Sequence, residues 1–263
     1  MARVRRVVVT VLAVLGAGYV GVAALAFFGQ RALLFPAPRT AERPSPASDV
    51  VELPETVLLV RQAGPDRPVV LHFHGNGEQL AWTEWMADAW GAQGVGFVAV
   101  EYPGYGLARD KGVASEESIV RAAEAASRYV REVLGVRNER LVVSGQSLGS
   151  GPAVELASRG VGAQLVLFTP YTSLPDVGAR VLPFLPIRLL MRDRFDSRSK
   201  AAQVTQPTLI VHGTADEVVP FELGEALARS LPAARMVRIE GGRHNDIAGR
   251  PEVWTELATF VSR

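Results

Sequence analysis

Gly145-Gln146-Ser147-Leu148-Gly149 is the stretch of the sequence that decides the fold. It fits the pattern G-x-S-x-G and lies between a strand-like apolar run, residues 141–144, and a helix-like apolar run, residues 152–157. A serine in this setting stands on a sharp strand-to-helix turn that presents its hydroxyl at the top of a sheet. Glycines suit the turn because its backbone is strained and closely approached. The pattern is short enough to arise by chance, so its meaning depends on its partners.

Outward from this turn, strand-like and helix-like segments alternate along the chain. Residues 51–60 suggest an early strand pair, and short apolar runs then alternate with segments of helical periodicity. Strands are expected at 68–73, 95–101, 141–144, 164–168, 207–212 and 236–240, and helices at 80–90, 115–134, 152–159, 221–231 and 252–262. This order predicts an α/β fold with a mostly parallel central sheet and helices on both faces.

Two further residues follow strand ends and complete the chemistry of Ser147. Asp216 comes after strand 207–212, and His244 comes after strand 236–240. A serine hydroxyl is a poor nucleophile until an imidazole takes its proton, and an aspartate fixes the imidazole tautomer. We therefore predict that Ser147, Asp216 and His244 meet at one edge of the sheet as nucleophile, orienting acid and base.

Such a nucleophile needs backbone N–H donors for the oxyanion that develops on its substrate. One donor is expected to be Leu148, directly after the nucleophile, and the other Asn76 or Gly77 in the loop after strand 68–73. Gly75, Tyr102 and Tyr171 are candidates for the substrate pocket, although the tyrosines could equally serve only in packing.

These residues lie in segments that resemble the α/β-hydrolases. The chain is most similar to a single-pass, membrane-anchored branch whose eukaryotic members include depalmitoylating and lysophospholipid-type hydrolases. The segments that carry the resemblance are Leu34-Phe35-Pro36, His74-Gly75-Asn76-Gly77, Tyr102-Pro103-Gly104-Tyr105-Gly106, Gly145 to Gly151, His212 to Pro220 and Gly242 to Asp246. The resemblance implies serine-hydrolase activity on an ester or thioester without a cofactor. One departure is Gly77-Glu78, where relatives often carry a small neutral pair.

Several residues have competing interpretations. Asp193, Asp196 and Asp246 are alternative acids, but the first two lie in a charged irregular stretch and Asp246 is only two residues from His244. His74 and His212 open loops, and we expect them to brace those loops by hydrogen bonds. His72 and His74 form an H-x-H pair that could bind zinc but lacks further ligands, so packing is favoured.

A second motif points to a different class of protein. Residues 75–80 partly match the dinucleotide-binding pattern G-x-G-x-x-G after a strand, with Glu101 at the end of the next strand. Leu80 stands where close helix–strand packing needs glycine or alanine, so this reading is disfavoured.

The composition excludes several classes of function. The chain has 263 residues and a formal net charge of +1, and the positive excess lies before residue 32, so the remainder is mildly acidic. No basic stripe suggests a nucleic-acid partner. The sequence contains no cysteine, which excludes disulfides, cysteine nucleophiles and thiolate metal sites.

The N-terminal segment is a candidate membrane anchor. Val7 to Phe28 contains 22 residues without a charge, enough at 1.5 Å per residue to cross a hydrocarbon core of about 30 Å. Arg3, Arg5 and Arg6 precede it, which favours a cytoplasmic N-terminus. The alternative is a cleaved signal peptide with Ala24-Leu25-Ala26 as the cleavage site, although its apolar run is longer than usual. Either interpretation places the remaining domain outside the cytoplasm, at the cell membrane or as a secreted or periplasmic protein.

The expected organisation is therefore an anchor at 1–30, a linker at 31–49 rich in Pro, Arg, Ala and Ser, and a hydrolase domain at 50–263. Within that domain, residues 171–204 lie where this fold often carries a short helical lid. This segment is apolar with interspersed arginines, and it could be a simple cover for the sheet, an acyl-chain pocket or a membrane-facing lid.

The sequence thus favours a membrane-anchored serine hydrolase acting on a small-molecule or lipid ester. Two alternatives remain open: an inactive, anchored binding domain, and an enzyme of haloperoxidase or dienelactone-hydrolase type on the same scaffold, because a fold does not fix a function.

Overall fold

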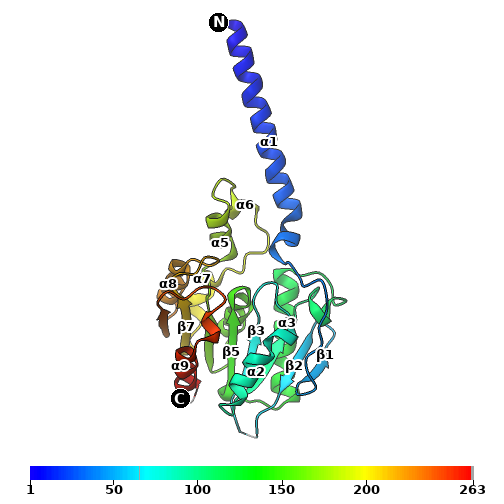
Figure 1. Ribbon diagram of the computed structural model, residues 1–263, viewed down its shortest axis with the longest axis vertical. Helices are drawn as coiled ribbons and strands as arrows, with labels where there is room; N and C mark the ends of the chain where they lie inside the picture. Colours follow the sequence, from blue (N-terminus) through cyan, green and yellow to red (C-terminus); the bar gives the residue numbers. More distant parts are fainter. Residues whose placement is uncertain (65, 262–263) are drawn as a thin grey trace.

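An eight-stranded sheet forms the centre of the computed structural model, which describes residues 1–64 and 66–261 (Figure 1). The strand order across the sheet is β1-β2-β4-β3-β5-β6-β7-β8. The strands are β1 (Asp49–Glu52), β2 (Val57–Arg61), β3 (Val69–Phe73), β4 (Gly96–Val100), β5 (Leu141–Gln146), β6 (Gln164–Phe168), β7 (Thr208–Gly213) and β8 (Ala234–Ile239). β2 pairs antiparallel with β1 and β4, and the pairs from β4 to β8 are parallel.

Helices cover both faces of this sheet, and side chains from successive strand positions divide between two cores. Val69 and Leu71 of β3 pack on one face, whereas Val70 between them packs on the other. The first face is covered by α3 (Glu116–Arg128), α4 (Ser150–Ser158) and α8 (Phe221–Ser230), and the second by α2 (Glu84–Gly91) and α9 (Pro251–Val261). The predicted fold class, a mostly parallel sheet between two helical layers, is confirmed.

The expected lid is an excursion between β6 and β7. It contains α5 (Leu174–Val181), α6 (Ile187–Leu190), α7 (Ser197–Lys200) and a 3₁₀ turn, η6 (Ala201–Gln203). α5 begins at Ser173, whose hydroxyl accepts a hydrogen bond from the backbone N–H of Asp176. α5 and α6 lie beside the lower part of α1, above the body of the protein (Figure 1).

The N-terminal helix α1 (Ala2–Leu34) projects from the domain (Figure 1). It continues four residues beyond the expected end of the anchor at residue 30 and stops at Phe35, which is buried in the core. Among the described residues, α1 is the helix whose length and apolar composition suit a membrane span, and an N-terminal signal sequence has the same properties. The chain after it is docked, because Ser45 and Ser48 donate hydrogen bonds to Glu84 on α2.

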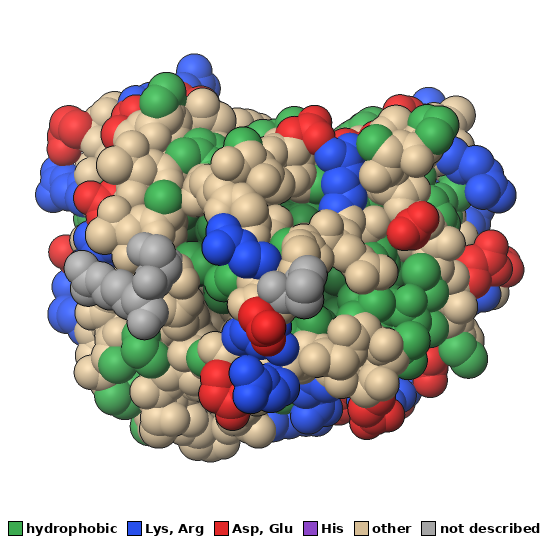
Figure 2. All heavy atoms as spheres, turned by 90° about the horizontal axis from the view of Figure 1, so that it is seen from below, with side chains coloured by type: hydrophobic (Ala, Val, Ile, Leu, Met, Phe, Trp, Pro, Cys, Tyr) green, Lys and Arg blue, Asp and Glu red, His purple; other side chains and the backbone are tan. Residues whose placement is uncertain are grey.

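Acidic and basic side chains are interspersed over the face that points away from α1 (Figure 2). This mixed surface agrees with the near-zero net charge of the chain.

The reversal of strand order places two loops together. The chain goes from β3 to β4 on one side, and β5 returns to the other side of β3. A crevice opens beyond the carboxyl ends of strands at such a switch point. Phe73 and Gly145 are paired across β3 and β5, so the loop after β3 and the turn after β5 leave the sheet side by side.

The turn after β5 is as strained and as crowded as its sequence predicts. Ser147 has φ of +50°, in the left-handed region that side-chain-bearing residues rarely adopt. A Cβ on Gly145 would overlap the carbonyl of Gly149, and a Cβ on Gly149 would overlap the carbonyl of Phe73. Both obstacles are backbone atoms, so neither glycine can be replaced without displacing a strand.

We therefore expect Gly149→Ala to lower the free energy of unfolding by about 2–3 kcal/mol, the upper range for overpacking a core. Gly249→Ala is the matched control, because no atom lies within 4 Å of its added Cβ, and it should change stability by less than about 0.5 kcal/mol. Thermal unfolding of both variants in detergent checks this expectation, and equal melting temperatures would contradict it.

Candidate active site

Ser147, His244 and Asp216 form a continuous hydrogen-bonded chain beyond the carboxyl ends of β5, β8 and β7. His244 Nε2 lies 3.0 Å from Ser147 Oγ, and His244 Nδ1 lies 2.8 Å from Asp216 Oδ2. All three residues are buried. A hydroxyl, an imidazole and a carboxylate in this order can transfer a proton from the hydroxyl to the ring.

The Asp216 carboxylate is held on both sides. Its Oδ1 accepts the backbone N–H groups of Val218 and Val219 at 2.9 and 2.7 Å, and His212 Nε2 lies 3.2 Å from Oδ2. Burial opposes the charged form, but the hydrogen bonds from His212 and His244 outweigh it and hold the pKa of Asp216 well below its usual range. Asp216 is therefore ionised at neutral pH and aimed at His244.

The three alternative acids lie in other interactions. Asp193 forms an ion pair with Arg31 at the end of α1. Asp196 caps α7 by accepting the Ser199 backbone N–H, and Asp246 accepts hydrogen bonds from the Arg243 backbone and the Arg250 side chain. Of these four aspartates, Asp216 is the one whose carboxylate lies within hydrogen-bond distance of His244.

The loop after β3 is supported from below by a buried polar group. His74 Nε2 lies 3.1 Å from Glu101 Oε1, with both side chains fully buried, and His74 Nδ1 lies 2.8 Å from the Gly75 carbonyl. Burial disfavours the charged imidazole, but the hydrogen bond and charge of Glu101 outweigh it and raise the pKa of His74. His74 thus braces this loop, as the sequence indicated for it and for His212.

Both polar atoms of the Asn76 side chain form hydrogen bonds that hold the loop. Its Nδ2 donates to the Leu34 carbonyl at 2.6 Å, and its Oδ1 accepts from the Tyr105 hydroxyl at 2.8 Å. The oxyanion donor expected at Asn76 is its backbone N–H, as at Leu148. Leu148 lies in the first turn of η5 (Ser147–Gly149), where backbone N–H groups have no partner within the helix.

An apolar pocket of about 300 Å³ adjoins Ser147. Its walls come from the end of α1, the two loops and the lid, and include Leu33, Leu34, Tyr171, Val177, Leu182 and Met191. The sequence suggested Tyr171 and an apolar lid as parts of a pocket, but it gave no indication that Leu33 and Leu34 line it. Their apolar character alone does not distinguish a pocket wall from a buried contact.

The other two expected pocket residues support the loop instead of lining this pocket. Tyr102 is fully buried, and its hydroxyl donates to the His74 carbonyl at 2.6 Å. The Gly75 backbone N–H donates to Glu78 Oε2 at 3.1 Å. The Glu78 carboxylate, at the position where relatives often have a neutral residue, therefore helps to fix the loop.

His72 and Glu101 are also engaged in the core. Burial lowers the pKa of His72 to about 3, so its ring is neutral, and its Nδ1 lies 3.1 Å from Ser144 Oγ. Glu101 accepts the Leu80 backbone N–H in addition to contacting His74. Its carboxylate is therefore engaged beneath the loop, which argues against the dinucleotide-binding interpretation of residues 75–80.

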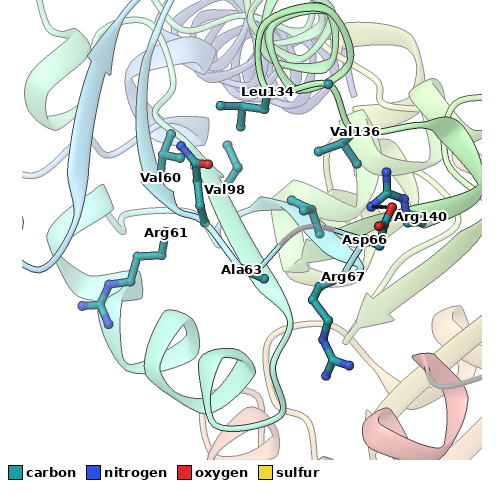
Figure 3. Close-up of a pocket in the computed structure, with 13 residues that line it drawn as sticks. Val60, Arg61, Ala63, Asp66, Arg67, Val98, Leu134, Val136 and Arg140 are labelled. Atoms are coloured by element: carbon teal, nitrogen blue, oxygen red, sulfur yellow. Dashed lines mark ion pairs between the residues drawn. The ribbon is translucent and has the colours of Figure 1, made fainter.

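A second hollow, of about 380 Å³, lies at the opposite end of the strands from Ser147 (Figure 3). It is lined by the ends of β2 and the beginning of β3, with Arg61 and Arg67 on its rim and an ion pair between Arg140 and Asp66 (Figure 3). This edge carries the amino ends of the parallel strands and is remote from Ser147, so the two hollows are separate.

Comparison with known proteins agrees with this architecture. Residues 64–194 match the family model described as serine aminopeptidase, S33, and residues 191–261 match the model described as TAP-like protein. The chain is 35% identical over 185 residues to an uncharacterized protein of Mycobacterium tuberculosis, covering 70% of this chain and 65% of that relative. It is 33% identical over 207 residues to the human alpha/beta hydrolase domain-containing protein 17C, covering 78% of this chain and 61% of that protein.

The chain thus spans less than two thirds of the length of these relatives. Among solved structures, an esterase of Pyrococcus furiosus superposes with a TM-score of 0.71 at 16% identity, covering 86% of this chain and 98% of the esterase. At this identity the superposition establishes a shared fold.

Glu101 offers a test of the support beneath the loop. Removing one partner of a buried charged pair leaves the other uncompensated, so Glu101→Ala should lower the free energy of unfolding by about 3–5 kcal/mol. In Glu117→Ala, which removes an exposed pair with Arg121 on α3, the loss should be about 0.5 kcal/mol or less. Melting temperatures measure both, and a small effect at Glu101 would refute a structural role for the pair.

Proposed function

Because the chain belongs to the α/β-hydrolase superfamily, we propose that it is a serine hydrolase that cleaves a carboxylic ester or thioester through an acyl-enzyme. The observation that carries the proposal is the hydrogen-bonded chain from Ser147 through His244 to Asp216. Ser147 is the nucleophile, His244 the general base and then the general acid, and Asp216 the residue that orients His244.

In the first half of the reaction, His244 Nε2 takes the proton of Ser147 as Oγ attacks the acyl carbon. The oxyanion of the tetrahedral intermediate is stabilised by the backbone N–H groups of Leu148 and Asn76. Collapse of the intermediate breaks the bond to the leaving alcohol or thiol, which receives the proton from His244. Water then attacks the acyl-enzyme by the same route, and the free acid departs.

The pocket beside Ser147 supports an acyl substrate. Its walls are mainly aliphatic, and Tyr171 contributes an aromatic ring whose hydroxyl already donates to the Leu148 carbonyl. Such a pocket suits a hydrocarbon chain better than a charged group. The esterase activity named for the Pyrococcus protein and the hydrolase name of the human relative point to the same reaction class.

We further propose that α1 anchors the enzyme in the cell membrane as a single span, with the hydrolase domain on the non-cytoplasmic side. Arg3, Arg5 and Arg6 before the apolar run favour this orientation. The contacts of α1 argue for an uncleaved helix, because the Tyr19 hydroxyl donates to the Phe184 carbonyl of the lid at 3.0 Å. Cleavage after Ala26 would remove that contact.

The nucleophile is tested by replacing Ser147 with alanine. The change should abolish labelling by a fluorophosphonate probe and lower kcat on p-nitrophenyl butyrate by about three orders of magnitude or more. Ser158→Ala, at the far end of α4, should label and turn over as the unmodified protein does. Undiminished labelling of the Ser147 variant would sink the assignment, and absence of turnover by the unmodified protein would favour a binding domain.

The anchor is tested by extraction of membranes that contain the full chain. The protein should remain in the membrane fraction after washes with high salt and with alkaline carbonate, because the apolar run is long enough to span the bilayer. A soluble product with an N-terminus near Phe27 would instead identify a cleaved signal peptide.

A further inference from the structure

We propose that the tip of the lid, residues 181–190, inserts into the bilayer leaflet beside α1, so that the domain has a second membrane contact besides its anchor. This inference rests on the proposed membrane span. The tip comprises the end of α5, the loop that follows and α6, and it lies beside the lower part of α1 (Figure 1).

The depth of the tip follows from a single contact. The Tyr19 hydroxyl donates to the Phe184 carbonyl at 3.0 Å, so Phe184 lies within the reach of one tyrosine side chain from Tyr19, beside the second half of the apolar run. Tyr19 precedes Phe28, the last residue of the apolar run, by about 13 Å along the helix axis at 1.5 Å per residue. One leaflet of hydrocarbon is about 15 Å thick. A helix that spans the bilayer over this run therefore places Phe184 within the leaflet.

The exposed side chains at the tip fit that environment. Val181, Phe184 and Leu189 are 66%, 62% and 85% exposed, although they are large and apolar. The one charged side chain in residues 181–190 is Arg188, which is paired with Asp176 on α5 at 2.9 Å. An apolar surface of this kind is unfavourable in water and favourable in lipid.

Part of the backbone of the tip is already paired without water. Irregular backbone enters hydrocarbon only where its polar groups are satisfied. Pro183 and Pro186 have no N–H to satisfy, and the N–H groups of Leu185 and Leu189 donate to carbonyls within the tip. The Phe184 carbonyl accepts from Tyr19, which at the same time gives that hydroxyl a partner inside the span.

Polar contacts at the end of α1 mark the level of the membrane surface. Gln30 Nε2 donates to the Leu190 carbonyl, and Gln30 Oε1 accepts the Arg192 backbone N–H. The Arg192 guanidinium lies over the ring of Phe27 at 5.2 Å from its centroid, and Arg31 pairs with Asp193. Cationic side chains next to the end of an apolar run are placed to meet lipid phosphates. The apolar tip lies on the membrane side of this band.

The chain contains no cysteine, so a single introduced cysteine can carry a fluorophore without removal of any native cysteine. The fluorophore then reports the depth of that position in the bilayer. The experiment places an environment-sensitive fluorophore at Phe184→Cys and at Leu189→Cys in the full chain, reconstituted in vesicles of phosphatidylcholine and phosphatidylglycerol. Val133→Cys is the matched control, because Val133 is a 67% exposed apolar residue beyond the end of α3, next to the hollow at the amino edge of the sheet.

Probes at positions 184 and 189 should shift to shorter wavelength and be quenched by nitroxides on the lipid chains. Quenching of the same probes by aqueous iodide should be several-fold weaker than at position 133. Iodide quenching at position 184 equal to that at position 133 overturns the inference. A probe at Leu15→Cys reports insertion of α1 itself: a lipid-quenched Leu15 with a water-exposed Phe184 rejects the lid contact alone, whereas water exposure at both rejects the anchor and the lid contact together. The readout needs no turnover, so inactivity toward esters would count against the proposed reaction and leave this test intact.

Discussion

The close approach of the turn after β5 to β3 is the constraint on which the rest of the site depends. Gly149 lies against the Phe73 carbonyl so tightly that a methyl group has no room, and this contact holds Ser147 at a positive φ above the sheet edge. The same contact sets the turn beside the loop that begins at His74. Ser147, the proposed nucleophile, and the expected oxyanion donors are therefore positioned by backbone packing between two paired strands, not by their own side chains.

Beneath that loop, the protein uses buried polar groups where apolar packing would be more usual. His74, Glu101 and Tyr102 are fully buried, and each forms hydrogen bonds within the site or its support. Buried polar groups with satisfied partners specify one geometry, since any displacement leaves a donor or acceptor unpaired. Asn76 extends this network to the Leu34 carbonyl and so joins the loop to the end of α1.

Periodicity and motif spacing were sufficient for the fold and for the meeting of Ser147, Asp216 and His244, because buried parallel strands and their end loops follow local rules. Their catalytic roles stay predictions. The contacts of Leu33, Leu34 and Gln30 were not predictable, since they depend on where α1 ends relative to the lid, which no local pattern encodes. Tyr102 shows the same limit: its position in a loop motif suggested the pocket, whereas its hydroxyl is directed to the His74 carbonyl beneath the loop.

The hydrogen bond between Asn76 and the Leu34 carbonyl also limits how far Ser147 can move relative to the membrane. A domain on a flexible tether samples a wide range of heights above its membrane, but here the helix runs without a break to the residue that holds the loop. If α1 spans the bilayer, Ser147 stands at a nearly constant height above the surface. The length of the helix then sets the distance of Ser147 from the bilayer, and the proposed hydrolase would reach only those bonds that lie in one thin layer next to the lipid headgroups.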